Sequence, residues 1–373
     1  MPALSRSDTS VLGRWWWSID RWVLFAVVGL IGFGYVMTLA ASPSVAERIG
    51  EPRDTFIVKQ VLFLALAGAL VVAVSLLSER ELRRLAVVGC AAALALTAAT
   101  LLIGVEIKGA RRWIAFPGFS LQPSEFLKPC FAVVTAWLLA EGKRQPRFPG
   151  MLIAGAILGL IILVLKSQPD IGMLSVVVAV FLTQLFIAGL NLLLVGVGFA
   201  CMTAAGVGAY FLFPHVHNRV THFLHPATGD HYQITTALEA FGNGGLLGRG
   251  PGEGEVKNVL PDAHADFVFA VTGEEFGFLV CLAVVCVFAF IVLHSLLRAR
   301  SEQSFFIILT ISGLATSFGL QAFVNMASSL HLIPTKGMTL PFISYGGSSV
   351  LAVALEMGML LGFTRQRHHG AAP

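Results

Sequence analysis

Long apolar segments, separated by short polar ones, recur along almost the whole chain. A helix needs about 20 consecutive apolar residues to cross a membrane, and solid apolar runs favour helices because membrane-spanning strands would alternate. The pattern therefore predicts an all-α polytopic membrane protein of about ten transmembrane helices. We expect these helices near residues 22–42, 56–78, 84–103, 123–140, 149–166, 171–188, 190–213, 267–297, 304–330 and 341–364.

One segment outside the predicted helices is long. Residues 214–266, between the seventh and eighth helices, contain six histidines, six carboxylates and three basic residues. Loops of this length are usually functional or disordered. We expect one membrane domain over residues 22–364, with a terminal segment 1–21 before it and a tail 365–373 after it.

Ten helices place both termini on the same side of the membrane, and the basic residues predict which side. Of the 25 lysines and arginines, 13 fall on the side of the termini and 10 on the other, with Lys59 and Lys128 inside helices. The basic residues are denser on the terminal side because the opposite loops are longer in total. By the positive-inside rule, the termini should be cytoplasmic and the long loop extracytoplasmic.

Composition supports a membrane protein and excludes several other classes. Hydrophobic residues make up 56% of the chain and charged residues 12%, against about 25% charged residues in soluble proteins. The net charge of +4 is mild and no basic run suggests nucleic-acid binding. All five cysteines lie in apolar stretches, which argues against a disulfide framework. The loop histidines show no recognised zinc spacing, and Trp15-Trp16-Trp17 are typical of an interfacial belt before the first span.

Two clusters of ionisable residues flank the fourth and sixth predicted helices. Charges at membrane depth are costly, so each cluster is a candidate functional site. Arg112 precedes the helix that carries Glu125 and Lys128, which share a helix face and can pair. That pair could line a cavity or simply hold the helix in place. Asp170 could likewise be a cavity residue or a helix N-terminal carboxylate favoured by the helix dipole.

Two further clusters lie next to the eighth and tenth predicted helices. Asp266 stands where the chain enters the eighth helix, as a candidate general base or an N-cap aspartate. Lys336 lies in a segment rich in Gly, Pro and Ser, which suits a phosphate or diphosphate group, although a kinked helix start would have the same composition. Together the clusters predict an anionic, amphipathic, membrane-borne substrate. The residues alone leave an enzyme and a transporter equally open.

Seven motifs in these regions resemble those of the SEDS family (shape, elongation, division and sporulation), and the resemblance covers roughly residues 20–365. The segment Pro334–Gly337 and the glycine run Gly248–Gly254 are more similar to division-type than to elongation-type members. In chain order, the motifs are Gly109-Ala110-x-Arg112-Trp113, Gln122–Glu125, Gln168-Pro169-Asp170-x-Gly172, Tyr232-Gln233, the glycine run, Leu260–Phe267 and Leu340–Ser348.

The resemblance implies a peptidoglycan glycosyltransferase that polymerises lipid II into β-1,4-linked glycan with inversion at the sugar. It implies Asp266 as the general base, with Glu125 and Lys128 in support. The substrate diphosphate would be held by cations, and Asp170 would be a further cavity residue. The residues expected to bind the diphosphate are Lys336, Arg219 and Arg112.

Family membership also implies partners and a location. We expect a class B penicillin-binding protein transpeptidase and other division proteins as partners, in the inner (plasma) membrane at the division septum. A divalent cation, Mg²⁺ or Mn²⁺, between Asp266 and the diphosphate is compatible with this chemistry, but the sequence does not establish one. The alternatives are a lipid II flippase, an elongation-type polymerase, or a scaffold that only recruits partners.

Overall fold

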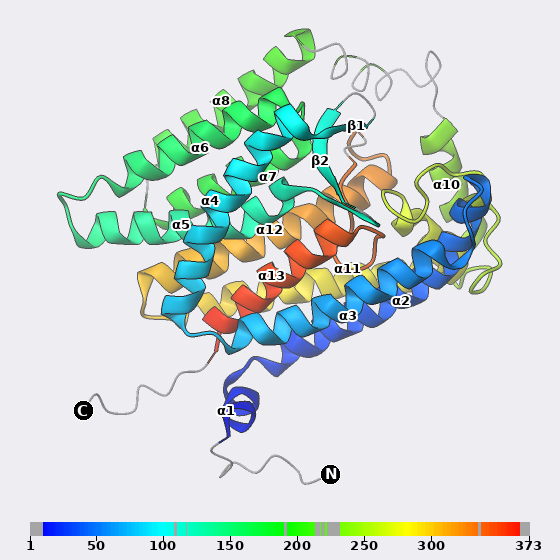
Figure 1. Ribbon diagram of the computed structural model, residues 1–373, viewed down its shortest axis with the longest axis horizontal. Helices are drawn as coiled ribbons and strands as arrows, with labels where there is room; N and C mark the ends of the chain where they lie inside the picture. The colour runs from blue at the N-terminus through cyan, green and yellow to red at the C-terminus, as the bar shows by residue number, and fades with distance from the viewer. Residues whose placement is uncertain are drawn as a thin grey trace.

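The computed structural model describes residues 10–107, 110–116, 118–189, 192–212, 217, 221, 232–334 and 337–365. Its helices pack as one bundle (Figure 1). They are α1 (Val11–Ser18), α2 (Arg21–Arg48), α3 (Asp54–Leu76), α4 (Glu79–Ile103), α5 (Pro123–Arg144), α6 (Gly150–Ser167), α7 (Ile171–Ile187), α8 (Leu192–Leu212), α10 (Tyr232–Gly244), the 3-10 turn η1 (Val256–Asn258), α11 (Val268–Ala299), α12 (Phe305–Ser329) and α13 (Gly347–Phe363).

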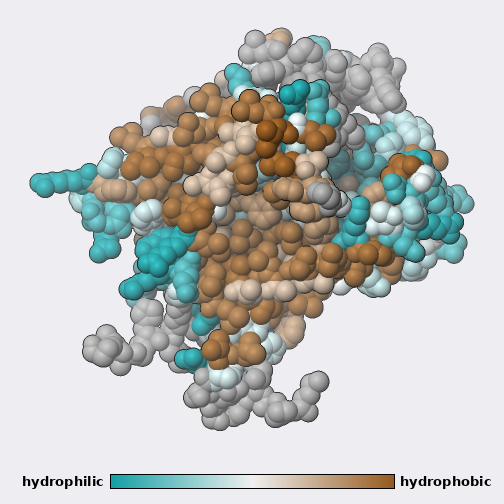
Figure 2. All heavy atoms as spheres, in the orientation of Figure 1, coloured by the Kyte–Doolittle hydropathy of each residue, from teal (hydrophilic) through white to brown (hydrophobic). Residues whose placement is uncertain are grey.

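Every predicted membrane span corresponds to one of these helices, so the predicted all-α polytopic fold is confirmed. Among the described residues, six helices are long and apolar enough to cross a membrane, namely α2, α3, α4, α6, α11 and α12, and α7 and α13 are apolar but shorter. Apolar side chains cover the middle of the bundle, between hydrophilic groups at its two ends (Figure 2). Large apolar side chains are exposed on these helices, among them Leu62 on α3, Leu102 on α4 and Leu163 on α6.

Both ends of the described chain lie at the same end of the bundle. The indole of Trp15 in α1 donates a hydrogen bond to Ser75 Oγ at the end of α3 (2.9 Å), and Arg365 donates to the Ser75 carbonyl (3.4 Å). Trp15 is therefore buried against the bundle, whereas we expected the whole Trp cluster to lie as an interfacial belt. At the same end, His294 of α11 contacts the carboxylate of Asp20, which caps α2 (2.7 Å).

A small antiparallel sheet precedes α5, where the apolar pattern predicts only a loop. It consists of β1 (Val105–Ile107), β2 (Ala110–Phe116) and β3 (Phe119–Leu121), in the order β1-β2-β3. Strands β1 and β3 have only three residues each, and the seven residues of β2 do not alternate between buried and exposed. The sheet connects to α13, because Ser348 Oγ donates to the Ser120 carbonyl (2.8 Å) and accepts from the amide of Gln122 (3.0 Å).

The last helix begins at Gly347, six residues later than the predicted start at 341. The intervening backbone bonds to other parts of the chain instead of continuing a helix. Ser344 Oγ accepts from the Leu340 amide (2.8 Å) and donates to the Ala265 carbonyl (2.6 Å). The Tyr345 amide donates to the His264 carbonyl (2.8 Å). These bonds join the segment before α13 to the segment before α11.

The predicted long loop 214–266 is structured over its described second half. Helix α10 and the glycine run after it pack on α11, where the backbone of Gly277 (φ 78°, ψ −178°) interrupts the helix. Two buried carboxylates hold this run. Glu275 accepts from Lys257 Nζ (2.6 Å) and the Gly252 amide (3.0 Å), and Glu274 accepts from the Val256 amide (3.0 Å).

Replacing Gly277 by Ala should destabilise the protein. This backbone conformation is nearly restricted to glycine and costs other residues roughly 1–3 kcal/mol. A Cβ there would also lie 2.3 Å from the Gly248 nitrogen, a backbone atom that is hydrogen-bonded to the Gly244 carbonyl. We expect a lower unfolding temperature in detergent for Gly277→Ala. The control is Gly68→Ala in α3, where a Cβ meets nothing within 4 Å; equal unfolding temperatures for the two variants would contradict this explanation of the kink.

Candidate active site

Asp266 lies in the turn before α11 and is partly buried. Its backbone carbonyl accepts a hydrogen bond from Asn325 Nδ2 (3.0 Å). Its carboxylate faces Gly337, where an added Cβ would lie 3.5 Å from Asp266 Oδ2. The N-cap position of α11 belongs to Phe267, which makes no side-chain cap. The alternative interpretation of Asp266 as the N-cap is therefore wrong.

Asn325 and Gln321 stand one turn apart on α12 and hold the segment before α13. Asn325 Nδ2 also donates to the Met338 carbonyl (2.6 Å). Gln321 Nε2 donates to the Thr339 carbonyl (3.1 Å) and lies 3.3 Å from Ser349 Oγ. Residues spaced i and i+4 share a helix face, so α12 presents one polar edge to the turn that contains Asp266.

The Glu125–Lys128 pair forms as the spacing predicts, and it connects to the same edge. Lys128 Nζ lies 2.8 Å from Glu125 Oε2, and the side chains are 1% and 12% exposed, respectively. Lys128 Nζ also donates to Gln321 Oε1. Because an ammonium group can only donate, it fixes the Gln321 amide with its oxygen toward Lys128 and its nitrogen toward Thr339. Glu125, Lys128, Gln321, Asn325 and Asp266 thus belong to one connected region.

Arg112 and Asp170 form a second pair at the same end of α5. Arg112 donates to the carbonyls of Gln168 (3.0 Å) and Pro169 (2.7 Å), and its Nη1 lies 3.5 Å from Asp170 Oδ2. Asp170 also caps α7, because its Oδ1 accepts from the Met173 amide (3.1 Å). The alternative interpretation of Asp170 as a helix N-terminal carboxylate is confirmed. Its carboxylate is still close enough to interact electrostatically with Glu125 and Lys128.

Two residues predicted to bind diphosphate, Arg219 and Lys336, lie outside the described residues.

A family model described as "Cell cycle protein", for FtsW, RodA and SpoVE, matches residues 21–369. The chain belongs to this family, the SEDS family. A relative from Caulobacter vibrioides, named probable peptidoglycan glycosyltransferase FtsW, is 42% identical over 98% of this chain and 94% of its own length. A relative of the same name from Trichlorobacter lovleyi is 36% identical over 92% of this chain and 93% of its own.

Solved structures of SEDS proteins have the same fold. One, described as part of a peptidoglycan synthase complex that coordinates polymerization and crosslinking, matches with a TM-score of 0.77 and 27% identity, over 94% of this chain and 99% of its own. The rod-shape-determining protein RodA of Thermus thermophilus matches with a TM-score of 0.69 and 26% identity, over 95% and 99% of the two chains.

The sequence reasoning missed two residues of this SEDS site, Gln321 and Asn325. They could have been found, since they are the two amide side chains of α12 and are spaced four apart. Ser344 and Tyr345 lie in the Leu340–Ser348 motif, but no local pattern could show their contacts with a segment about 80 residues away in the chain. Among the described residues, no group of three or more His, Cys, Asp or Glu side chains could hold a metal ion.

His264 is the residue of this turn whose protonation the structure constrains. Its ring packs between Phe56 and Tyr345, with centroids 5.2 and 4.9 Å away. Burial lowers its pKa to about 4; Arg48 adds to this and Asp262 opposes it. The unfolded state, with a pKa near 6.5, then binds more protons between about pH 4 and pH 6.5. His264 should therefore favour folding fully above that range and lose this contribution as the pH falls through it.

Replacing His264 by Phe tests this linkage. The variant keeps a ring between Phe56 and Tyr345 but carries no titrating group. We expect the unfolding temperature of the wild type to fall more than that of His264→Phe between pH 6.5 and pH 4. Parallel curves for the two proteins would show that His264 is not buried in its neutral form.

Proposed function

We propose that this SEDS protein is a peptidoglycan glycosyltransferase that polymerises lipid II at the division septum. The observation that carries the proposal is the position of Asp266, whose turn is bonded through Asn325 to the same edge of α12 that meets the buried Lys128–Glu125 pair. The FtsW names of its relatives support the same activity and a division role.

In the proposed reaction, the Asp266 carboxylate takes the proton from the 4-hydroxyl of the acceptor N-acetylglucosamine. That oxygen attacks the donor sugar at C1 from the face opposite the diphosphate. A C1–O bond to the acceptor forms, the C1–O bond to the diphosphate breaks, and undecaprenyl diphosphate leaves with the electron pair. The α-linked donor becomes a β-1,4 glycoside, as in other inverting sugar transfers in which one carboxylate activates the nucleophile.

A diphosphate leaves without a protonating acid but needs positive charge near its oxygens. We assign this role to Lys336, Arg219 and Arg112. Arg112 is also bonded to three acceptors of the protein, so its larger contribution is to position the turn before α7, with Asp170 at its end. Lys128, itself paired with Glu125, fixes Gln321 and through it the segment at Thr339. That segment leads back to Gly337 beside Asp266.

The same proposal includes an orientation and partners. The distribution of basic residues favours cytoplasmic termini, with residues 1–21 and 365–373 flanking the membrane domain 22–364 and the loop 214–266 outside the cytoplasm. A class B penicillin-binding protein would crosslink the new strand together with other division proteins. The similarity to a chain from a complex that couples polymerization and crosslinking supports such a partner.

Reconstitution in vesicles with labelled lipid II separates this enzyme from a transporter. Two preparations are compared, one with and one without a transpeptidase partner in the same vesicles. If the protein is the enzyme, we expect glycan chains and an equivalent release of undecaprenyl diphosphate. A flippase would move lipid II between leaflets without forming chains, and that result in both preparations would refute the proposed function.

A further inference from the structure

A cavity of about 340 Å³ lies at the end of the bundle opposite Asp266. It is formed where α5 and α7 end and α6 and α12 begin. Since α5 has 22 residues, it extends for roughly 33 Å, close to the thickness of a membrane's hydrocarbon core. Its first two turns carry Glu125 and Lys128 and its last turn carries Lys143. The cavity therefore lies at the other membrane surface.

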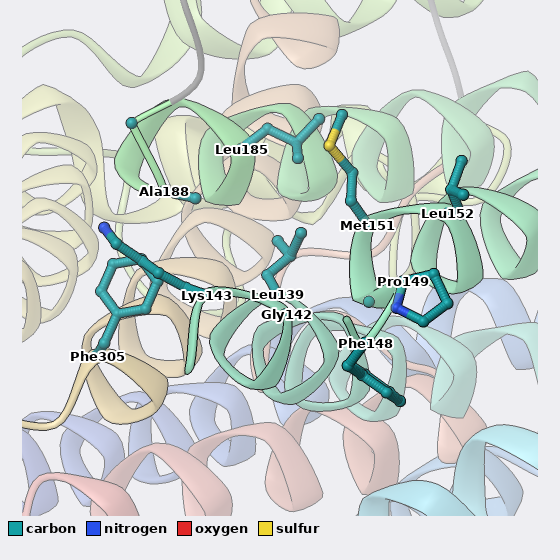
Figure 3. Close-up of a pocket in the computed structure, with 12 residues that line it drawn as sticks. Leu139, Gly142, Lys143, Phe148, Pro149, Met151, Leu152, Leu185, Ala188 and Phe305 are labelled. Carbon is teal, nitrogen blue, oxygen red and sulfur yellow. The ribbon is translucent and has the colours of Figure 1, made fainter. Parts of the chain in front are cut away.

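The cavity has an apolar wall and a cationic edge. Leu139, Met151 and Leu185 surround its centre, and Lys143 lies over the ring of Phe305 at one side (Figure 3). The Lys143 nitrogen is 4.2 Å from the centroid of that ring. Met151 and the neighbouring Leu152 are 49% and 76% exposed, so the apolar wall is open toward the surface that faces lipid acyl chains.

The segment that connects α5 to α6 carries a surplus of positive charge beside this cavity. Lys143, Arg144 and Arg147 are exposed, and Glu141 is the one carboxylate between residues 141 and 149. Glu141 lies 3.9 Å from Arg144, and Glu302, three residues before Phe305, is the next acidic side chain on the adjoining helix connection. Two of the three cations thus have no carboxylate in their own segment to neutralise them.

We propose that this cavity binds one anionic phospholipid of the adjacent leaflet. An acyl chain would occupy the apolar wall, and the phosphate would lie between Lys143 and the basic segment 144–147. Basic pockets between membrane helices bind acidic lipid headgroups in this way, and each Lys or Arg near an anionic lipid surface strengthens binding about fivefold. The proposal concerns a site distinct from the polymerising centre and does not depend on the proposed function.

The test is native mass spectrometry of the purified full-length protein with phosphatidylglycerol or phosphatidylcholine of identical acyl chains. We expect one retained phosphatidylglycerol, and a loss of tenfold or more, following from about fivefold per charge, in K143Q/R144Q/R147Q. The matched control is R80Q/R83Q/R84Q. It removes three charges at the same end of the bundle, where Arg83 lies over Trp137 of α5, but away from the cavity, and it should retain the lipid.

A second variant separates the cavity from its charges. Met151→Trp fills the apolar wall from an exposed position and keeps every cation, so it should also release phosphatidylglycerol. Equal retention of the two lipids by the wild type, equal losses in the two triple variants, or full retention by Met151→Trp would each overturn the proposal. Full retention by Met151→Trp with loss in K143Q/R144Q/R147Q would mean that the basic segment holds the lipid by charge alone, without the cavity.

Discussion

Replacing Asp266 by Asn is expected to reduce the rate of lipid II polymerisation by about 10²–10⁴-fold, the usual contribution of a general base. Asn keeps the shape of the side chain and the backbone carbonyl that accepts from Asn325, but it cannot accept the acceptor hydroxyl's proton. The loss should therefore appear in kcat, with lipid II affinity and unfolding temperature close to those of the wild type.

The matched control for this variant is Asp262→Asn in the same turn. Asp262 has a positive φ of 53°, which Asn tolerates better than most residues, and it shapes the turn through its carbonyl, which accepts from the amides of Ala265 and Phe267. We expect near wild-type polymerisation from Asp262→Asn. If both variants lost activity equally, the effect would come from the shape of the turn and not from a proton transfer.

Replacing Lys128 by Met is expected both to destabilise the protein and to abolish most of its activity. The substitution keeps the length of the side chain but leaves the Glu125 carboxylate and Gln321 Oε1 without this donor. Breaking a buried ion pair by removing one partner costs on the order of 3 kcal/mol. With its orientation no longer fixed, Gln321 would also release Thr339, so polymerisation should fall by tenfold or more.

The double variant Glu125→Gln/Lys128→Met separates the two effects. It removes the unpaired charge and should recover much of the unfolding temperature, while polymerisation stays low. The exposed pair Glu106–Arg111 serves as the control, since its side chains are more than half exposed and such surface pairs contribute little to stability. If Lys128→Met kept wild-type activity, the Lys128–Gln321 contact would have no part in the site.

The sequence predicted those parts of the fold that depend on local pattern. Each of the ten predicted apolar runs corresponds to a helix of the described residues, and the i, i+3 spacing of Glu125 and Lys128 predicted their pair. The start of α13 was wrong by six residues, because hydrogen bonds from Ser344 and Tyr345 to the turn before α11 replace helical ones there. Hydrogen bonds between two segments so far apart in the chain leave no periodic pattern in the sequence of either segment.

The sequence predicted which residues belong to the site more completely than how those residues contact one another. Charge cost at membrane depth and the family motifs singled out Asp266, Glu125, Lys128, Asp170 and Arg112. They left open whether Asp170 lines a cavity or caps α7, and they could not show that Arg112 bonds the carbonyls before it. Charge cost did not mark Gln321 and Asn325, because their amides are neutral, and only their i, i+4 spacing on α12 could have pointed to them.

The most direct test of Asp266 as the centre of a lipid II polymerase is glycan synthesis in detergent, where there is no membrane to cross. Purified wild type, Asp262→Asn and Asp266→Asn would each be incubated with labelled lipid II, alone and with a transpeptidase partner, and the products separated by length. We predict long glycan chains from the wild type and Asp262→Asn and almost none from Asp266→Asn. Chains formed by Asp266→Asn at the wild-type rate would contradict the assignment.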